Sequence, residues 1–284
     1  MYEYTKSIKS PNSDEPINTY LLRPLAGLVV RALYDTRVTP NQVTVVSTIV
    51  GLAAALTYLN GTPVGVASAG LLVTAKDVLD SADGQLARAK QQYSRSGRFL
   101  DSIGDFIVNV CVFASIGYML SARNGAWEYA LLALLGLLGI TFRVSYHVFY
   151  QTSYLHFEQK YETNRVTEEV REEDRSSDSW TLHLQAVYQA IYGWQDKLVL
   201  RIDKWCRGST QNEESQRVWY SDVVGMRLSG FIGMGTELFL LTVCSLLNKL
   251  ELYLYLNVLL MNGVLLSNLL YRNVFVHRTL NSRG

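Results

Sequence analysis

Six long apolar runs most strongly limit what this chain of 284 residues can fold into. They occupy residues 43–59, 64–75, 106–120, 130–142, 228–247 and 252–270, and the only charged residue inside them is Glu237. A helix needs roughly 20 apolar residues to cross a bilayer core of about 30 Å, and the shorter runs reach that length when their polar flanks lie at the interface. A soluble helical protein would show more half-polar helices. The sequence therefore predicts an all-α, polytopic membrane protein with six transmembrane helices.

The connections between these runs indicate the orientation of the helices. Connections 60–63, 121–127 and 248–251 are short and carry few charges, whereas the termini, the stretch 80–105 and a long segment after residue 150 are rich in charge. An excess of Lys and Arg marks the cytoplasmic side. We therefore expect an integral protein of the cell inner membrane whose termini face the cytoplasm.

The polar start, residues 1–16, does not resemble a cleavable signal peptide. The net charge of +1 gives no indication of a nucleic-acid partner.

The chain divides into four segments by composition. Residues 1–38 form an N-terminal cytoplasmic segment that ends in an amphipathic interfacial helix, with apolar residues at 21, 25, 28, 29, 32 and 33 and with Arg23 and Arg31 off that face. Residues 39–150 hold the first four transmembrane helices, with Thr39 as N-cap and Pro40 in the first turn. Residues 151–226 are a cytoplasmic helical insertion, and residues 227–284 hold the last two spans and a short tail.

The insertion combines a charged part with a periodic part. Residues 164–179 are charged and predicted to be solvated, whereas residues 182–206 show helical periodicity. Tyr192, Trp194, Trp205 and Trp219 can lie at the membrane surface or pack within a small helical cap. We favour packing.

Four aspartates stand between the second and third apolar runs. Asp80 and Asp83 are three residues apart, and Asp101 and Asp105 are four apart, so each pair shares one face of a helix. The first pair ends the second span and the second pair begins the third, so all four carboxylates can converge at one membrane depth. Like charges repel each other, and hard divalent cations with oxygen ligands relieve that repulsion. The pattern therefore predicts a metal site.

Neighbouring residues extend this prediction to a phosphate-containing ligand. Gly84 permits close approach of the backbone, and Arg88 supplies a forked cation suited to phosphate. The alternative is a helix end at which Arg88 and Lys90 merely neutralise the acids. Four acids at matched spacings favour a functional site, since ionisable residues in membrane segments are mostly functional.

The pattern Asp80-x2-Asp83-Gly84-x2-Ala87-Arg88-x8-Gly97-x3-Asp101-x3-Asp105 resembles the signature of the CDP-alcohol phosphatidyltransferase family. The stretch TPNQVT at residues 39–44 is also similar to that family. The resemblance implies a six-helix membrane enzyme of phospholipid synthesis, usually a homodimer, that displaces CMP from a CDP-linked donor.

The same resemblance assigns roles to the residues of the signature. It implies that Asp80, Asp83 and Asp101 hold a divalent metal ion, Mg²⁺ or Mn²⁺, and that Asp105 shares in metal binding and acts as the catalytic base. It also implies a binding site for the CDP-linked donor formed by Asp80, Gly84, Ala87, Arg88 and Gly97.

The sequence does not distinguish between several possible donors and acceptors. The donor can be CDP-diacylglycerol, with inositol, inositol phosphate, glycerol phosphate or serine as acceptor, or it can be a CDP-linked head group transferred to a diacylglycerol or ceramide hydroxyl. Overall resemblance favours an inositol-type acceptor. Arg143 and His147, four residues apart in the fourth span, can bind an anionic acceptor. The equal alternative is that Arg143 reaches the interface or pairs with an acid.

Two alternative functions, those of a transporter and of a scaffold, were also considered. An ion-coupled membrane transporter would need acids dispersed along its helices, and only Glu237 fits that pattern. A scaffold would need only the Gly- and Ala-rich stretches, which we interpret as sites of close helix packing. The clustering of the other acids favours the enzyme.

Overall fold

The structure, a computed structural model, describes residues 4, 14–158, 179–208 and 213–276, and the regular secondary structure within these residues is all helical. The prediction of an all-α protein is therefore confirmed for the described residues. The long helices of the first part are α3 (Pro40–Tyr58), α4 (Pro63–Lys90), α5 (Arg95–Asn124) and α6 (Glu128–Phe157). The later helices are α8 (Ser179–Arg207), α9 (Glu213–Tyr220), α10 (Val223–Gly230), α11 (Met234–Leu246), α12 (Leu250–Tyr255) and α13 (Asn262–Tyr271).

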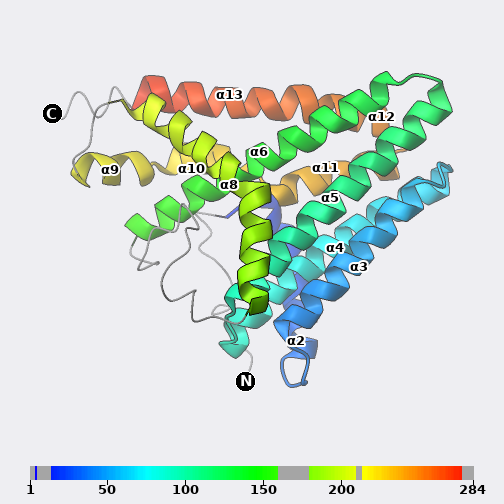
Figure 1. Ribbon diagram of the computed structural model, residues 1–284, viewed down its shortest axis with the longest axis horizontal. Coiled ribbons are helices and arrows are strands. Elements are labelled where there is room, and N and C mark those ends of the chain that lie inside the picture. The colour runs from blue at the N-terminus through cyan, green and yellow to red at the C-terminus, as the bar shows by residue number, and fades with distance from the viewer. Residues whose placement is uncertain (1–3, 5–13, 159–178, 209–212, 277–284) are drawn as a thin grey trace.

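The long helices form a fan. In Figure 1 they meet on the right, where the short connections α3–α4, α5–α6 and α11–α12 lie, and they spread apart towards the left. Buried apolar side chains from α3 to α6, α11 and α12 form the main core, which includes Tyr58, Phe113, Ile140 and Tyr253. Gly70 allows α4 and α11 to pack closely, because a Cβ there would lie only 2.5 Å from the Cβ of Ser245.

Among the described residues, five segments are long and apolar enough to cross a membrane, where the sequence predicted six spans. They are Pro40–Tyr58, Arg95–Asn124, Glu128–Phe157, Glu214–Leu246 and Leu250–Val274. The helix missing from this set is α4, which packs between α3 and α11 but carries charged residues from its midpoint onward, among them Lys76, Asp77, Asp80 and Asp83. These charges lower its mean hydropathy, so composition alone marks α4 as different from its neighbours.

The last two apolar runs are less regular than the sequence suggests. The run 228–247 is interrupted at residues 231–233, between α10 and α11. The run 252–270 contains a π-helical segment, η2 (Leu256–Met261), between α12 and α13, and a second one, η3 (Arg272–Val276), follows α13. π-Helical turns are frequent at functional sites, and η2 carries the buried Asn257, whose side-chain amide donates a hydrogen bond to Glu237 of α11.

The expected amphipathic helix corresponds to the π-helical η1 (Asn18–Leu22) followed by α2 (Arg23–Leu33). Leu21, Leu25 and Leu28 are exposed along one side, and Ala26 is buried on the other, which packs on α4. Arg23 departs from the expectation of a polar surface residue, because it is buried and forms an ion pair with Asp14.

The insertion is attached to the membrane-spanning helices by a second core. α6 extends to Phe157, so the predicted boundary at residue 150 falls inside a helix. The buried carboxylate of Asp203 in α8 accepts hydrogen bonds from Tyr150 Oη at 2.8 Å, Trp219 Nε1 at 2.8 Å and Tyr220 Oη at 2.7 Å. The favoured interpretation of packing is thus correct for Trp219 but wrong for Trp194 and Trp205, which are exposed.

Candidate active site

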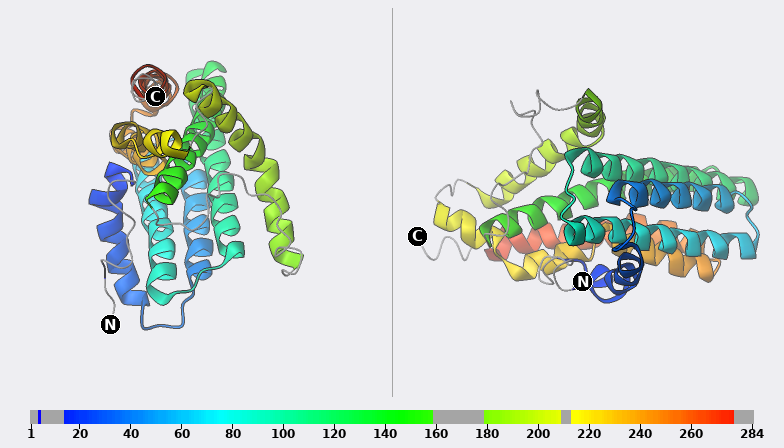
Figure 2. Two further views of the ribbon diagram at one scale, coloured as in Figure 1. Left: turned by 90° about the vertical axis from the view of Figure 1, so that its left-hand side faces the viewer. Right: turned by 90° about the horizontal axis from the view of Figure 1, so that it is seen from below.

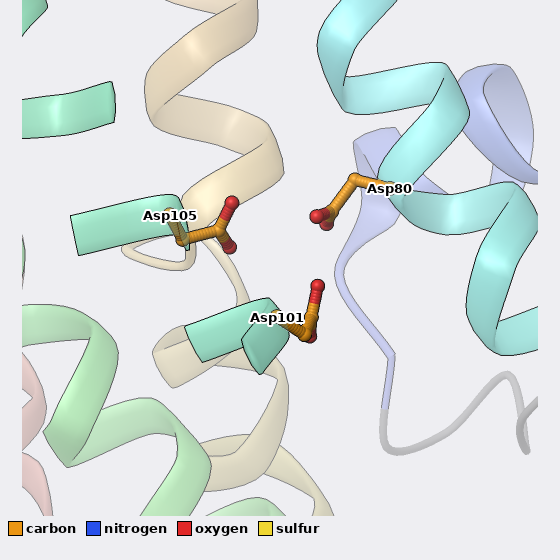
Figure 3. Close-up of side chains that lie close together, drawn as sticks. All are labelled: Asp80, Asp101 and Asp105. Carbon is orange, nitrogen blue, oxygen red and sulfur yellow. The ribbon is translucent and has the colours of Figure 1, made fainter. Parts of the chain in front are cut away.

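Three of the four predicted aspartates face one another across α4 and α5. Figure 3 shows Asp80 pointing from α4 towards Asp101 and Asp105 of α5. One carboxylate oxygen of each residue lies within 4.8 Å of one oxygen of each of the others. The spacing of the sequence explains this arrangement, because Asp101 and Asp105 lie one helical turn apart on the face of α5 that is turned to α4.

The fourth aspartate has a different environment. Asp83 is 7% exposed and accepts a hydrogen bond from Thr44 Oγ1 of α3. It is not part of the group of three. The stretch TPNQVT explains how Thr44 comes to this position: Thr39 and Gln42 form a capping box that begins α3, with Gln42 N donating to Thr39 Oγ1 at 3.4 Å. α3 therefore starts beside the aspartates and contributes a side chain to them.

A lysine that the sequence reasoning missed lies among the acids. Lys76 of α4 is 3% exposed, forms an ion pair with Asp105 and places its ammonium 3.4 Å from Asp80 Oδ1. A signal was present, since Lys76 is a lone cation at the end of an apolar run and four residues before Asp80. Asp77, also buried, adds a further acid to this part of α4.

The group of three carboxylates can hold a divalent metal ion. Its donors are hard oxygen atoms, which Mg²⁺ and Mn²⁺ prefer. Asp101 Oδ1 is buried and accepts no hydrogen bond from any residue in the described part of the chain. A buried carboxylate oxygen without a partner is costly, and a metal ion would remove that cost. The residues present therefore fit such an ion.

The other residues of the signature line the same end of α4 and α5. Gly84, Ala87 and Arg88 follow Asp80 by four, seven and eight residues, so they share its face of α4. The guanidinium of Arg88 lies over Gly84, where a Cβ would be 3.6 Å from Arg88 Nη1. Gly97, in the first turn of α5, has no room for a side chain because Asn41 and Ser94 fill the space beside it.

The insertion contacts the aspartate-bearing turn of α5. Tyr192 Oη of α8 donates a hydrogen bond of 2.9 Å to the carbonyl oxygen of Ser102, between Asp101 and Asp105. The ring of Tyr192 also packs edge-on against Phe106. Burial raises the pKa of the Tyr192 phenol above its ordinary value, and the nearby carboxylate of Asp105 raises it further, so this hydroxyl stays protonated and remains a donor.

The two residues suggested for the acceptor lie deeper in the helix bundle. Arg143 is fully buried, forms an ion pair of 2.9 Å with Glu237 of α11 and donates a hydrogen bond of 2.8 Å to Asn262 Oδ1. His147 is 3% exposed, with Nδ1 3.2 Å from Ser229 Oγ. For Arg143 the structure shows the alternative left open by the sequence, pairing with an acid. The same ion pair neutralises Glu237, the one acid whose position within an apolar run agreed with the alternative of an ion-coupled transporter.

Within the described residues, the chain thus combines five segments able to cross a membrane with a group of acids between two of its long helices that could hold a metal ion. Residues 37–164 match the family model of the CDP-alcohol phosphatidyltransferases. The resemblance of the sequence to that family is therefore confirmed for this part of the chain.

Two similar curated proteins come from Thermococcus kodakarensis and Pyrococcus horikoshii. The chain is 36% identical over 127 residues to the bifunctional IPC transferase and DIPP synthase of Thermococcus kodakarensis, which is 44% of this chain and 28% of that protein. It is 29% identical over 116 residues to the archaetidylinositol phosphate synthase of Pyrococcus horikoshii, which is 41% of this chain and 56% of that protein. The chain thus spans less than two thirds of either relative, and α8 to α13 lie beyond the family match.

Proposed function

We propose that the protein is a metal-dependent CDP-alcohol phosphotransferase of phospholipid synthesis. It transfers a substituted phosphate, phosphatidyl from CDP-diacylglycerol, to an acceptor hydroxyl and releases CMP. The observation that carries the proposal is the convergence of the Asp80, Asp101 and Asp105 carboxylates inside the matched domain.

Each residue of the signature then has a role. A divalent ion, Mg²⁺ or Mn²⁺, supplies neutralisation of the donor diphosphate when bound. Asp80, Asp83 and Asp101 would hold it, with Asp105 as a further ligand. The guanidinium of Arg88 is suited to bidentate hydrogen bonding with a phosphate, and the small residues Gly84 and Ala87 would leave space for the nucleotide beside α4. Gly97 would let the first turn of α5 pack against Asn41 and Ser94 beside that site.

Asp105 is the residue that would act as base. Its carboxylate would take the proton of the acceptor hydroxyl while the hydroxyl oxygen forms a bond to the donor phosphorus. The bond between that phosphorus and the bridging oxygen breaks, and CMP leaves with the electron pair. Lys76 holds Asp105 in place, and Tyr192 fixes the backbone of the same turn through Ser102.

We propose an inositol-type acceptor, inositol or inositol phosphate. The support is the name of the Pyrococcus relative, an archaetidylinositol phosphate synthase. Arg143 and His147 would serve such an acceptor only if the pairing of Arg143 with Glu237 opened, so we favour a structural role for Arg143. The second candidate reaction is transfer of a head-group phosphate from a CDP-linked alcohol to a diacylglycerol or ceramide hydroxyl.

We further propose that α4 crosses the membrane as the sixth span, that η1 and α2 lie in the interface, and that the protein is a homodimer of the cell inner membrane with its active site and termini in the cytoplasm. Lys197 of α8 is exposed and suits a topology test. An impermeant thiol reagent should label a Lys197→Cys variant only after cells are opened, and labelling of intact cells would refute the orientation.

Purified protein in bilayer discs, radiolabelled CDP-diacylglycerol and a panel of acceptors test the proposed reaction. We expect metal-dependent CMP release and a labelled lipid product with inositol or inositol phosphate. Product formed only from a CDP-linked head group and diacylglycerol would establish the second candidate instead.

A further inference from the structure

One side of α8 is apolar and exposed over its whole length. Trp180, Val187, Trp194, Leu198 and Trp205 are separated by seven, seven, four and seven residues, so they share one face of the helix. Their exposed fractions are 59, 45, 54, 37 and 74%. Large apolar surfaces on a folded chain usually mark an interaction site. This set is called the tryptophan stripe below.

Basic side chains border the tryptophan stripe. Lys197, Arg201 and Lys204 are exposed and lie on the adjoining side of α8. The acidic residue Asp203 is on the opposite, buried side, where it accepts its three hydrogen bonds. The exposed half of the helix therefore combines tryptophan with positive charge. A second copy of the chain, packed face to face, would bring like charges together, whereas anionic lipid head groups would neutralise them.

α8 is attached to the helix bundle near the aspartates. Its buried side is fixed to two membrane-spanning helices, through Tyr192 and Ser102 on α5 and through a 2.8 Å hydrogen bond from Ser145 Oγ of α6 to Gln195 Oε1. Figures 1 and 2 show that α8 lies on the outer flank of the bundle and runs across α5 and α6 rather than along them. It crosses α5 at the turn between Asp101 and Asp105, and so lies at the polar end of the spans.

We infer that the tryptophan stripe and its basic border are a docking surface for a bilayer that contains anionic lipids. Tryptophan is enriched at the membrane–water interface, and basic residues beside an apolar face strengthen binding to anionic head groups. α8 then lies on the cytoplasmic membrane surface as a second interfacial helix. Through Tyr192 it connects that surface to the turn of α5 that carries Asp101 and Asp105.

Tryptophan fluorescence with brominated lipids tests the inference. The full-length protein is placed in bilayers of phosphatidylcholine and phosphatidylglycerol, with the bromine on one lipid or the other at equal mole fraction. We expect brominated phosphatidylglycerol to quench more, because each basic side chain strengthens binding to an anionic surface roughly fivefold, which corresponds to about 1 kcal/mol. Replacing both Trp194 and Trp205 by Phe should remove most of this difference. The matched control is Trp127→Phe, since Trp127 lies at the other end of the spans, before α6, and its loss should leave the difference unchanged.

The charge is tested separately from the apolar contact. Replacement of Lys197, Arg201 and Lys204 by Gln should equalise quenching by the two brominated lipids. Three results would overturn the inference. Quenching of Trp194 and Trp205 by aqueous iodide in place of lipid bromine would mean that they are exposed to water, and quenching by neither would mean that protein, such as a second copy, covers them. No effect of the Gln variant would mean that anionic lipid is not selected.

Discussion

Removal of the Lys76 charge should expose the repulsion among the acids. The ammonium contacts Asp105 and lies 3.4 Å from Asp80, and the three side chains are only 4, 16 and 22% exposed. A Lys76→Met variant keeps the length and apolar character of the side chain but leaves two acids without their cation. Breaking a buried ion pair by removal of one partner typically costs about 3–5 kcal/mol. Because the acids keep some contact with solvent, we expect about 3 kcal/mol, the lower end of that range.

The bound metal ion should offset this loss. Any ligand that binds only the folded state stabilises it by mass action, and a cluster with more uncompensated negative charge binds a cation more tightly. In chelator, the variant should melt well below the wild-type protein. The difference should shrink as Mg²⁺ or Mn²⁺ is added. Thermal unfolding in bilayer discs at constant ionic strength measures both effects.

Lys90 provides the matched control for this experiment. It belongs to the same helix, but its ammonium donates to the carbonyl oxygens of Thr36 and Val38 at 2.9 and 2.8 Å rather than to an acid. Lys90→Met should cost less and should not respond to metal. Equal melting temperatures of Lys76→Met and wild type in chelator, or the same metal response for both lysine variants, would refute the reasoning.

Three further predictions concern single side chains. Asp105→Asn should keep much of the affinity for the CDP-linked donor but lose transfer by roughly 10²–10⁴-fold, the usual worth of a positioned base; equal loss of nucleotide binding and turnover would make it chiefly a metal ligand. Tyr192→Phe should raise the metal concentration needed for half-maximal activity while leaving the melting temperature within a few degrees of wild type. A large fall of the melting temperature together with that rise would indicate a purely structural role. Glu15 is buried, and its carboxylate oxygen accepts a hydrogen bond of 3.1 Å from Thr236 N. Burial raises the pKa of Glu15 from 4.5 to about 8. Between these two pH values the side chain is therefore protonated in the folded chain and charged in the unfolded chain. Stability should therefore fall as pH rises through that window, and a Glu15→Gln variant should show a flatter profile of melting temperature between pH 5 and 8; identical profiles would contradict the assignment.

The spacing of the aspartates could be predicted from the sequence because helical periodicity alone places Asp101 and Asp105 on one face. The same periodicity, together with the apolar runs, was sufficient to predict that the protein belongs to the all-helical fold class. Lys76 was missed because a single basic residue at the end of an apolar run looks like a snorkelling side chain. Only the packing of α4 against α5 shows that its ammonium lies between two carboxylates.

Partners that are far apart in the sequence account for the remaining differences. The pairing of Arg143 with Glu237 joins residues on α6 and α11, and no local pattern selects one acid as the partner of a given arginine. The break at residues 231–233 is associated with Glu15, whose carboxylate accepts from the first turn of α11. Trp219 and Trp205 both stand among aromatic and charged residues, but only Trp219 packs into the second core, where it donates a hydrogen bond to Asp203.

Release of CMP from CDP-diacylglycerol by the purified protein tests the central claim most directly. The measurement compares wild type with Asp101→Asn, in Mg²⁺ and in excess chelator, with inositol phosphate as acceptor. We expect CMP release by the wild type in Mg²⁺, none above background in chelator, and a large loss in the variant that added metal does not fully restore. Full CMP release in chelator, or an Asp101→Asn variant as active as wild type, would contradict a metal-dependent site built on these aspartates.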